Sequence, residues 1–206
     1  MLLRIHPDNP DERKIRIISE CLKDGGVIIY PSDTVYTLGC DIYQAKAVDR
    51  ISKIKGIDHK NANFSFICYD LSHLSDFVFS IDTTLYRVMK KATPGPFTFI
   101  LRANNNVPKI FQSKKKTVGI RIPDNKICKS IVKELGNPIM SSSLHDDDNL
   151  VEYSTDPELI YEKYNNSVDI VVDGGHGGRK PSTVLDCSDG EVTIVRQGLG
   201  NIHEYI

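Results

Sequence analysis

The sequence predicts a single α/β domain whose sheet mixes parallel and antiparallel strands. Segments with helical spacing of apolar residues alternate with short apolar or alternating segments along all 206 residues. Several of the expected strands are separated by hairpin-like distances, which is typical of antiparallel pairs in an otherwise helix-connected sheet. No repeat, low-complexity tract or linker divides the chain, so we expect one domain over residues 1–206.

The composition is that of a soluble globular protein, with 40% hydrophobic and 26% charged residues. A net charge of -1 gives no overall attraction to nucleic acid or to an anionic membrane, so any such binding would need a local patch. The five cysteines are scattered and never in C-x-x-C spacing, which indicates buried free thiols in a reducing compartment. No apolar run approaches about 18 residues, and the first residues lack the apolar core of a signal peptide. We therefore expect a cytoplasmic protein without a membrane partner.

The chain up to residue 101 contains three expected helices and three expected strands. Glycines after the first two helices, and Pro94-Gly95-Pro96 after the third, mark the helix ends. The strands are short runs of apolar or alternating residues. The expected helices are residues 11–22, 47–54 and 82–92. The expected strands are residues 27–30, 64–68 and 97–101.

The rest of the chain adds two helices and five strands. Gly136 ends the first of these helices, and Asp156 followed by Pro157 is typical of a helix N-cap with proline at the first helical position. The expected helices are residues 127–135 and 156–164. The expected strands are residues 117–122, 138–140, 168–172, 183–187 and 191–196.

The stretch VIIYPSDTVYTLGC, residues 27–40, is the first candidate for a site. Its strand is expected to end at Pro31, and the residues that follow are rich in hydroxyls and end in Gly39. Such a turn can direct hydrogen-bonding groups into a crevice at the edge of a sheet, although a polar turn that only caps the strand would look the same. Hydroxyls recur at two other strand ends, Ser141–Ser143 and Ser182–Thr183, so we expect these segments to meet at one site.

Isolated cations accompany these hydroxyls. They are Lys55 at a helix end, Arg121 inside a strand, Lys180 before a proline and Arg196 at the end of the last strand. An arginine in an alternating strand either pairs with an acid or reaches a carboxylate or phosphate, and the sequence leaves both open for Arg121.

Other polar segments have a simpler explanation than a site. The glycine-rich basic loop at residues 173–180 can wrap a phosphate, but it matches no nucleotide-binding fingerprint and a mobile surface loop is the default. His145 precedes three aspartates in what we interpret as a solvated loop, and we predict no metal site. Lys109 and Lys114–Lys116 form a basic patch, either solvated or in contact with RNA.

Seven motifs occur in order between about Asp11 and Gly198: YPSDTVYTLGCD, IKGID, TPGPFTFIL, VGIRIPDN, MSSSL, KPSTVLD and VRQG. Together they resemble the YrdC-like family, whose best-known members are the L-threonylcarbamoyladenylate synthases of tRNA modification. The opening IHPDNP, the segment Ser141–Ser143 and the GG-x-GG-x-KP loop are closer to the YciO branch of that family.

The resemblance implies a twisted open α/β sheet with flanking helices and a large basic cleft. It also implies an enzyme that joins L-threonine, bicarbonate and ATP, with Mg²⁺, into threonylcarbamoyl-AMP and pyrophosphate. By resemblance, the substrate-binding residues are Thr34, Tyr36, Arg121 and Ser143. The nucleotide-binding residues are Lys55, Ser141, Ser143, Ser182 and Arg196, and the catalytic cations are Lys55 and Arg121. This chemistry needs positioning and neutralisation of phosphate charge rather than a protein nucleophile.

The sequence departs from the synthase pattern at two positions. Ile57 replaces the arginine of the family's K-x-R motif, and His145 replaces the asparagine of its S-x-N motif. Loss of a guanidinium fork at a phosphate is not conservative, so we predict slow or absent synthesis. The alternatives are a protein that binds double-stranded RNA or tRNA through the basic cleft, and a nucleotide-binding domain without catalysis.

Overall fold

Ten strands form one mixed sheet in the computed structural model, which describes residues 1–57, 64–111, 116–144 and 155–206. The strand order is β1-β8-β2-β3-β7-β4-β6-β5-β9-β10. The strands are β1 (Leu2–Arg4), β2 (Ile28–Tyr30), β3 (Thr37–Asp41), β4 (Ser65–Ile67), β5 (Phe97–Arg102), β6 (Thr117–Arg121), β7 (Ile139–Ser143), β8 (Ile170–Asp173), β9 (Thr183–Asp186) and β10 (Thr193–Arg196). The α-helices are α1 (Glu12–Lys23), α2 (Ala45–Ile54), α3 (Leu74–Phe77), α4 (Thr83–Ala92), α5 (Lys126–Leu135) and α6 (Pro157–Tyr164). The predicted α/β class, with a mixed sheet and flanking helices, is confirmed.

Side-chain caps start the expected helices where the sequence indicated. The Asp11 carboxylate accepts from the amide of Lys14 at the start of α1, and the Asn125 side chain accepts from the amide of Cys128 in α5. Each cap satisfies an amide that the first helical turn leaves without an intrahelical acceptor. At the other end of α5, Gly136 adopts φ 83°, the left-handed conformation that favours glycine.

The main difference from the expected elements is β3. We expected residues 31–39 to form a glycine-terminated turn, but the turn is shorter and Thr37–Asp41 form a fully buried central strand. Gly39 lies within that strand. A larger residue would not fit there, because a Cβ at this position would lie 2.6 Å from Cε1 of Tyr30, whose ring packs over it. Glycine therefore marks a close approach here rather than the end of a turn.

Two further strands differ from expectation. Strand β7 continues through Ser143, so the serines are inside the strand and not after it. Strand β1, only three residues long, was not expected and pairs with β8 in parallel.

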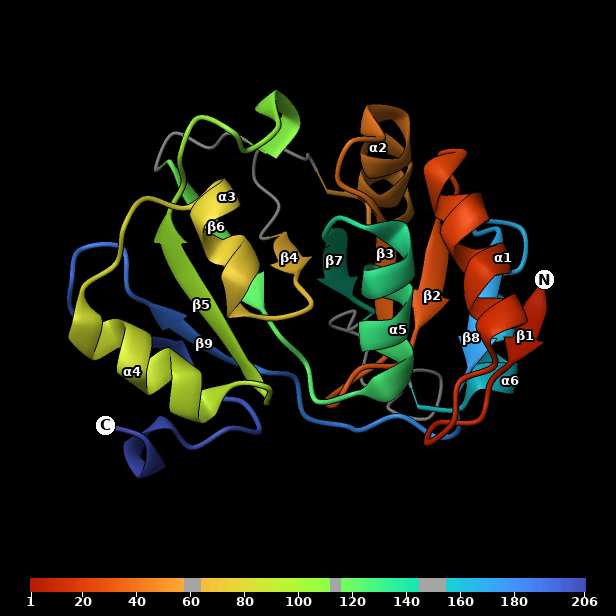
Figure 1. Ribbon diagram of the computed structural model, residues 1–206. Helices are drawn as coiled ribbons and strands as arrows, with labels where there is room; N and C mark the ends of the chain where they lie inside the picture. The colour runs from red at the N-terminus through yellow and green to blue at the C-terminus, as the bar shows by residue number, and fades with distance from the viewer. Residues whose placement is uncertain (58–63, 112–115, 145–154) are drawn as a thin grey trace.

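The helices divide between the two faces of the sheet. The apolar sides of α1 and α5 pack on one face, over β8, β2 and β7, and form the smaller hydrophobic cluster. Helices α2, α3, α4 and α6 pack on the other face and form the larger one. Because neighbouring strands twist by about 20°, a ten-stranded sheet turns through well over a right angle. For this reason α1 and α5 lie in front of the strands on the right of Figure 1, whereas α3 and α4 lie in front of β5 on the left.

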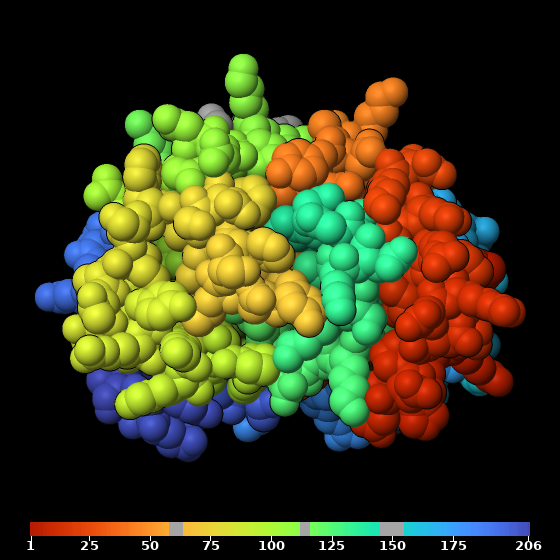
Figure 2. All heavy atoms as spheres, in the orientation of Figure 1, coloured from red at the N-terminus to blue at the C-terminus, as the bar shows by residue number. Residues whose placement is uncertain are grey.

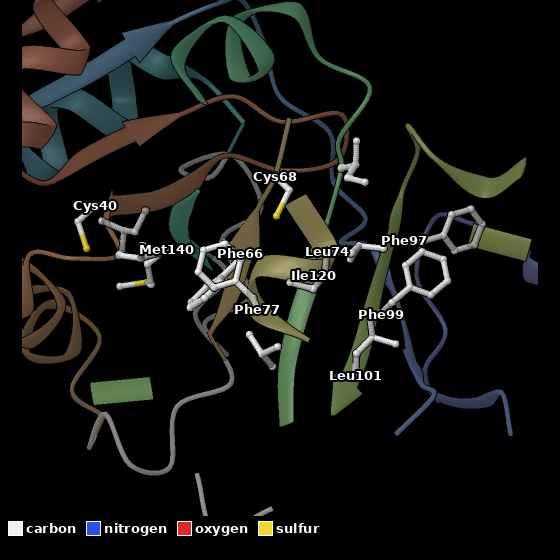
Figure 3. Packing of buried hydrophobic residues seen from close by; sticks show 14 of the residues in the cluster. Cys40, Phe66, Cys68, Leu74, Phe77, Phe97, Phe99, Leu101, Ile120 and Met140 are labelled. Carbon is white, nitrogen blue, oxygen red and sulfur yellow. The ribbon is translucent and has the colours of Figure 1, made fainter. Parts of the chain in front are cut away.

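The larger cluster is built on aromatic rings. Phe66 and Phe77 meet edge to face with ring centroids 5.5 Å apart, and Phe97 and Phe99 continue the cluster along β5 (Figure 3). In the space-filling view, the side chains of α1, α5, α3 and α4 cover the side of the molecule turned to the viewer (Figure 2).

The five cysteines are free thiols, and four of them are buried. Burial raises the pKa of the Cys128 thiol to about 12, so this group stays protonated and unreactive at neutral pH. Within the described residues, no helix combines the length and the apolarity needed to span a membrane.

Candidate functional site

Strand register places the predicted serines of β7 and Arg121 on the same face of the sheet. Ser141 pairs with Ser65 of β4, and Ile67, two residues further along β4, pairs with Arg121 of β6. Directly paired residues point to the same face, and so do residues two apart along a strand. Ser143, two residues after Ser141, therefore shares this face as well.

The same face continues across β5, β9 and β10. Thr98 pairs with Val184 of β9, which also pairs with Arg196 of β10. Ser182 lies two residues before Val184, and its hydroxyl is 2.8 Å from that of Thr98. The nucleotide-binding residues predicted at the end of the chain therefore share a face with Arg121.

We call this part of the sheet the polar face. It consists of Ser65, Thr98, Arg121, Ser141, Ser143, Ser182 and Arg196. Two apolar residues on the same side, Ile100 and Val184, are partly exposed and belong to neither hydrophobic cluster. The apolar sides of α1 and α5 pack on the neighbouring part of this face, over Ile67 and Ile139, so the hydroxyls and guanidinium groups line the part of the sheet beside that cluster.

Arg121 is the most buried cation of the polar face, with 5% of its surface exposed. Its Nη2 donates to Asp33 Oδ1 at 2.5 Å, to Thr34 Oγ1 at 2.5 Å and to Ser32 Oγ at 3.2 Å. The sequence left open whether Arg121 pairs with an acid or reaches a ligand. The structure shows the acid, Asp33, in the turn between β2 and β3.

This pairing does not use the whole guanidinium. All three contacts involve Nη2, whereas Nε is buried and has no hydrogen-bond partner among the residues that the structure describes. A buried donor without an acceptor costs about 1–3 kcal/mol. A carboxylate or phosphate that accepts from this donor would remove that cost, and arginine is the side chain best suited to bind either group.

Thr34 and Tyr36, predicted to bind substrate, are held by other parts of the protein. The Thr34 hydroxyl accepts from Arg121 and lies 3.1 Å from the hydroxyl of Ser32. The Tyr36 hydroxyl donates to the carbonyl of Gly175 at 2.7 Å and accepts from the amide of Gly174 at 3.3 Å. Its hydrogen bonds therefore fix the glycine-rich loop, and a direct contact between Tyr36 and a substrate stays a prediction.

The glycine-rich loop packs tightly on the turn between β2 and β3. A Cβ on Gly177 would lie 2.7 Å from the ring of Tyr36, and one on Gly178 would lie 2.0 Å from the carbonyl oxygen of Thr34. The amides of Gly174, Gly175 and Gly177 all donate to protein oxygens. These three amides are not available to cradle a phosphate.

We expect Gly178→Ala to displace this loop and to weaken binding on the polar face. The added methyl cannot fit beside the Thr34 carbonyl, so the free energy of unfolding should fall by about 1–3 kcal/mol. The control is Gly190→Ala, where φ is 90° and no atom lies within 4 Å of the added Cβ. It should cost about 1–2 kcal/mol through backbone strain alone. Denaturant unfolding measures the loss of stability, which we expect in both variants. Ligand titration measures binding, which should weaken only in Gly178→Ala. Equal ligand affinities of the two variants would contradict this account of the loop.

Lys55 is held at the end of α2 by the backbone. The amide of Gly56 donates to the Lys53 carbonyl and the amide of Ile57 to the Ser52 carbonyl, which is the Schellman pattern with glycine at φ 64°. From this position, Nζ of Lys55 donates to the carbonyl of Ser143 at 2.5 Å. The structure therefore brings Lys55 to the end of β7, next to one of the predicted hydroxyls.

Arg196 and Ser182 form the opposite part of the site. Nη2 of Arg196 donates to the Ser182 carbonyl at 2.9 Å, and Nε donates to the same oxygen at 3.3 Å. Partial burial, together with the positive charge of Arg121, lowers the pKa of the Arg196 guanidinium. Two cations close enough to repel each other favour an anion between them.

The structure supports most of the predicted grouping and corrects its details. The hydroxyls share a face rather than a row of strand ends, and Ser142 and Thr183 point to the opposite face. Asp33 and Thr98 were not among the predicted residues. An acid inside a hydroxyl-rich turn was a signal for Asp33, whereas only strand register reveals Thr98. His145, its three aspartates, Lys114 and Lys115 lie outside the described residues.

No group of three or more metal-binding side chains occurs in the described part of the chain. The cations on or beside the polar face include Arg121, Arg196 and Lys55. The buried hydroxyl of Tyr30 also points to this face, near Ser141, and burial raises its pKa.

Sequence comparisons link the chain to one family. The Sua5/YciO/YrdC family model, described as telomere recombination, matches residues 20–198. The chain is 40% identical over 203 residues to the uncharacterized protein YciO of Escherichia coli (strain K12), covering 98% of this chain and 97% of that protein. It is 27% identical over 174 residues to the threonylcarbamoyl-AMP synthase of Coxiella burnetii (strain RSA 493 / Nine Mile phase I), covering 84% of this chain and 92% of that protein.

Solved structures give the same relationship. The crystal structure of E. coli YciO matches with a TM-score of 0.92 at 39% identity, covering 100% of this chain and 99% of that one. The crystal structure of P. abyssi Sua5 in complex with L-threonine matches with a TM-score of 0.83 at 25% identity. That match covers 96% of this chain and 57% of the longer Sua5 chain.

Proposed function

Because the chain belongs to the Sua5/YciO/YrdC family, we propose that it binds L-threonine and ATP at the polar face and joins them with bicarbonate into threonylcarbamoyl-AMP. Pyrophosphate is the second product. The proposal rests on the threonylcarbamoyl-AMP synthases among its relatives and on Sua5, which binds L-threonine.

The observation that carries the proposal is the state of Arg121. Its guanidinium is 5% exposed and its buried Nε has no acceptor among the described residues, while Asp33 neutralises its charge from one side only. This arrangement suits a small ligand with a carboxylate, because Nε can donate a charge-assisted hydrogen bond to one carboxylate oxygen. We assign Arg121 to the carboxylate of threonine, with Thr34, Tyr36 and Ser143 around it.

The chemistry at the nucleotide is a transfer of the α-phosphoryl group. The amine of threonine combines with bicarbonate, with loss of water, to give a carbamate; one carbamate oxygen then forms a bond to the α-phosphorus, and the bond from that phosphorus to pyrophosphate breaks. Such a reaction depends on positioning and on stabilising phosphate charge. Lys55 and Arg196 supply positive charge, and Ser141, Ser143 and Ser182 supply hydroxyl donors. Mg²⁺ would arrive with the ATP phosphates, which are its usual oxygen ligands.

The test is direct. The protein is incubated with ATP, bicarbonate, Mg²⁺ and L-threonine, and pyrophosphate and threonylcarbamoyl-AMP are measured together. We expect both products, in equal amounts and at a low rate, only when all four components are present. Pyrophosphate release that is independent of threonine, or no product under any condition, would refute the proposal.

RNA binding is the alternative function, and the geometry of Arg121 argues against it as the role of this residue. A side chain that is 5% exposed cannot reach the backbone of a duplex without a rearrangement. An RNA site would instead use exposed cations, whose contacts with phosphates make binding fall steeply with added salt. If the protein binds a duplex with steep salt dependence and does not bind threonine, RNA is the better assignment. A domain that binds ATP without turnover would be the third possibility.

A further inference from the structure

Among the described residues, Asp33 is the one acid in contact with the buried guanidinium, and nothing in the proposed chemistry uses it yet. Its side chain is 8% exposed. Oδ1 accepts from Nη2 of Arg121, and Oδ2 accepts from the backbone amide of Asp124 at 3.1 Å. Each carboxylate oxygen thus has a different donor.

These two contacts join separate segments around the site. Asp33 lies in the turn between β2 and β3, whereas Asp124 lies between β6, which ends at Arg121, and α5. The carboxylate therefore connects the turn to the loop that follows Arg121. An asparagine could not do the same, because only its carbonyl oxygen can accept a hydrogen bond. Its NH₂ group would face either the Arg121 guanidinium or the Asp124 amide, and both of these are donors.

The guanidinium is planar, so fixing one of its nitrogens orients the other two. Ser32, Asp33 and Thr34 all accept from Nη2. With Nη2 held inside the turn, the position of Nε is fixed as well, and Nε has no acceptor among the described residues. The nitrogen that lacks an acceptor is therefore not the one that Asp33 occupies.

We propose that Asp33 is a positioning residue for amino-acid recognition: it holds Nη2 of Arg121 so that Nε donates to the carboxylate of the amino acid. This inference rests on the proposed function, in which Arg121 binds that carboxylate. Asp33 acts through Arg121 and need not touch the substrate.

The opposite role would also follow from a carboxylate beside an arginine. If Asp33 stood where the substrate carboxylate binds, it would compete with substrate, and its removal would strengthen binding. The separation between the nitrogen held by Asp33 and the unpartnered Nε favours positioning. The two roles predict opposite changes in affinity.

The first measurement compares Asp33→Asn with the wild-type chain by calorimetric titration. We expect the affinity for L-threonine to fall roughly 10- to 100-fold, the range for loss of a well-oriented hydrogen bond to a charged group, while the affinity for ATP stays within about twofold. Asp41→Asn is the matched control, because Asp41 is 5% exposed and accepts from the Tyr43 amide and from Asn137 Nδ2. It should leave both affinities unchanged. If Asp33→Asn does not fold, Asp33→Glu, which keeps the charge but moves it by one methylene, should weaken threonine binding in the same direction.

The second measurement does not depend on substrate. In ¹⁵N NMR spectra, the Nε–H resonance of Arg121 is assigned by its disappearance in Arg121→Lys. A guanidinium fixed in a buried site exchanges this proton slowly with water, so we expect slow exchange in the wild type and faster exchange in Asp33→Asn but not in Asp41→Asn. Unchanged exchange in Asp33→Asn, or unchanged or increased affinity for threonine, would overturn the inference. Absence of threonine binding by the wild type would refute the proposed function, and the exchange rates would still decide whether Asp33 holds Arg121.

Discussion

Replacement of Arg121 by alanine is expected to abolish measurable binding of L-threonine and to lower the free energy of unfolding by about 3–5 kcal/mol. The loss of stability follows because Asp33 would keep its charge, at 8% exposure, without the cation that neutralises it. The loss of binding follows because Arg121 provides the only buried guanidinium among the described residues of the polar face. Denaturant unfolding measures the first effect and calorimetric titration the second.

The double variant Arg121→Ala with Asp33→Ala separates stability from binding. Removing both charges leaves no unpaired ion, so most of the lost stability should return, as it often does when a buried ion pair is replaced as a whole. Threonine binding should not return. If the double variant recovered binding together with stability, Arg121 would be a structural residue and its assignment to the substrate would be wrong.

The second large effect is expected at the end of α2. Ile57→Arg should raise the rate of threonylcarbamoyl-AMP formation by about 10- to 100-fold, since a hydrogen bond to a charged group contributes about 1.5–3 kcal/mol. Ile57 is 38% exposed and directly follows the left-handed Gly56, so the longer side chain can extend into solvent without disturbing the core. Lys55→Ala should abolish the activity that remains, and addition of His145→Asn should increase the gain from Ile57→Arg.

Ile17→Arg is the control for Ile57→Arg. Ile17 is an isoleucine of comparable exposure, 43%, on α1, so the same substitution there changes the net charge equally without adding a cation next to Lys55. Initial rates of pyrophosphate release at saturating threonine give the comparison. If the wild type turned over rapidly and did not respond to Ile57→Arg or Lys55→Ala, the placement of the nucleotide beside Lys55 would be wrong.

The secondary structure was largely predictable because its signals are local. Helices α1, α4 and α5 have both an apolar side and a side-chain cap in the sequence. Strand β3 was missed because its glycine looks like the end of a turn, and only the position of the Tyr30 ring explains why glycine is needed there. Strand β1 was missed because three residues are too few to show a period.

The site was predictable in its composition but not in its geometry. Hydroxyls and cations in an ordered series of motifs indicated Ser141, Ser182 and Arg121, and the structure places them on one face. Which serine of a run faces the site depends on strand register, which sequence patterns do not fix at strand ends. The two alternatives for Arg121, an acid or a ligand, also do not exclude each other, because Asp33 contacts Nη2 and Nε has no acceptor among the described residues.

The most direct test of this account is whether the carboxylate of the amino acid is what the protein recognises. Calorimetric titrations of the wild-type chain with L-threonine and with L-threoninol, which has a hydroxymethyl group in place of the carboxylate, give the answer. We predict that L-threonine binds and that L-threoninol binds at least about 100-fold more weakly, since its neutral hydroxymethyl group cannot replace the charged carboxylate at Arg121. Equal affinities for the two compounds would contradict the assignment of Arg121, and with it the central role of the polar face in threonine binding.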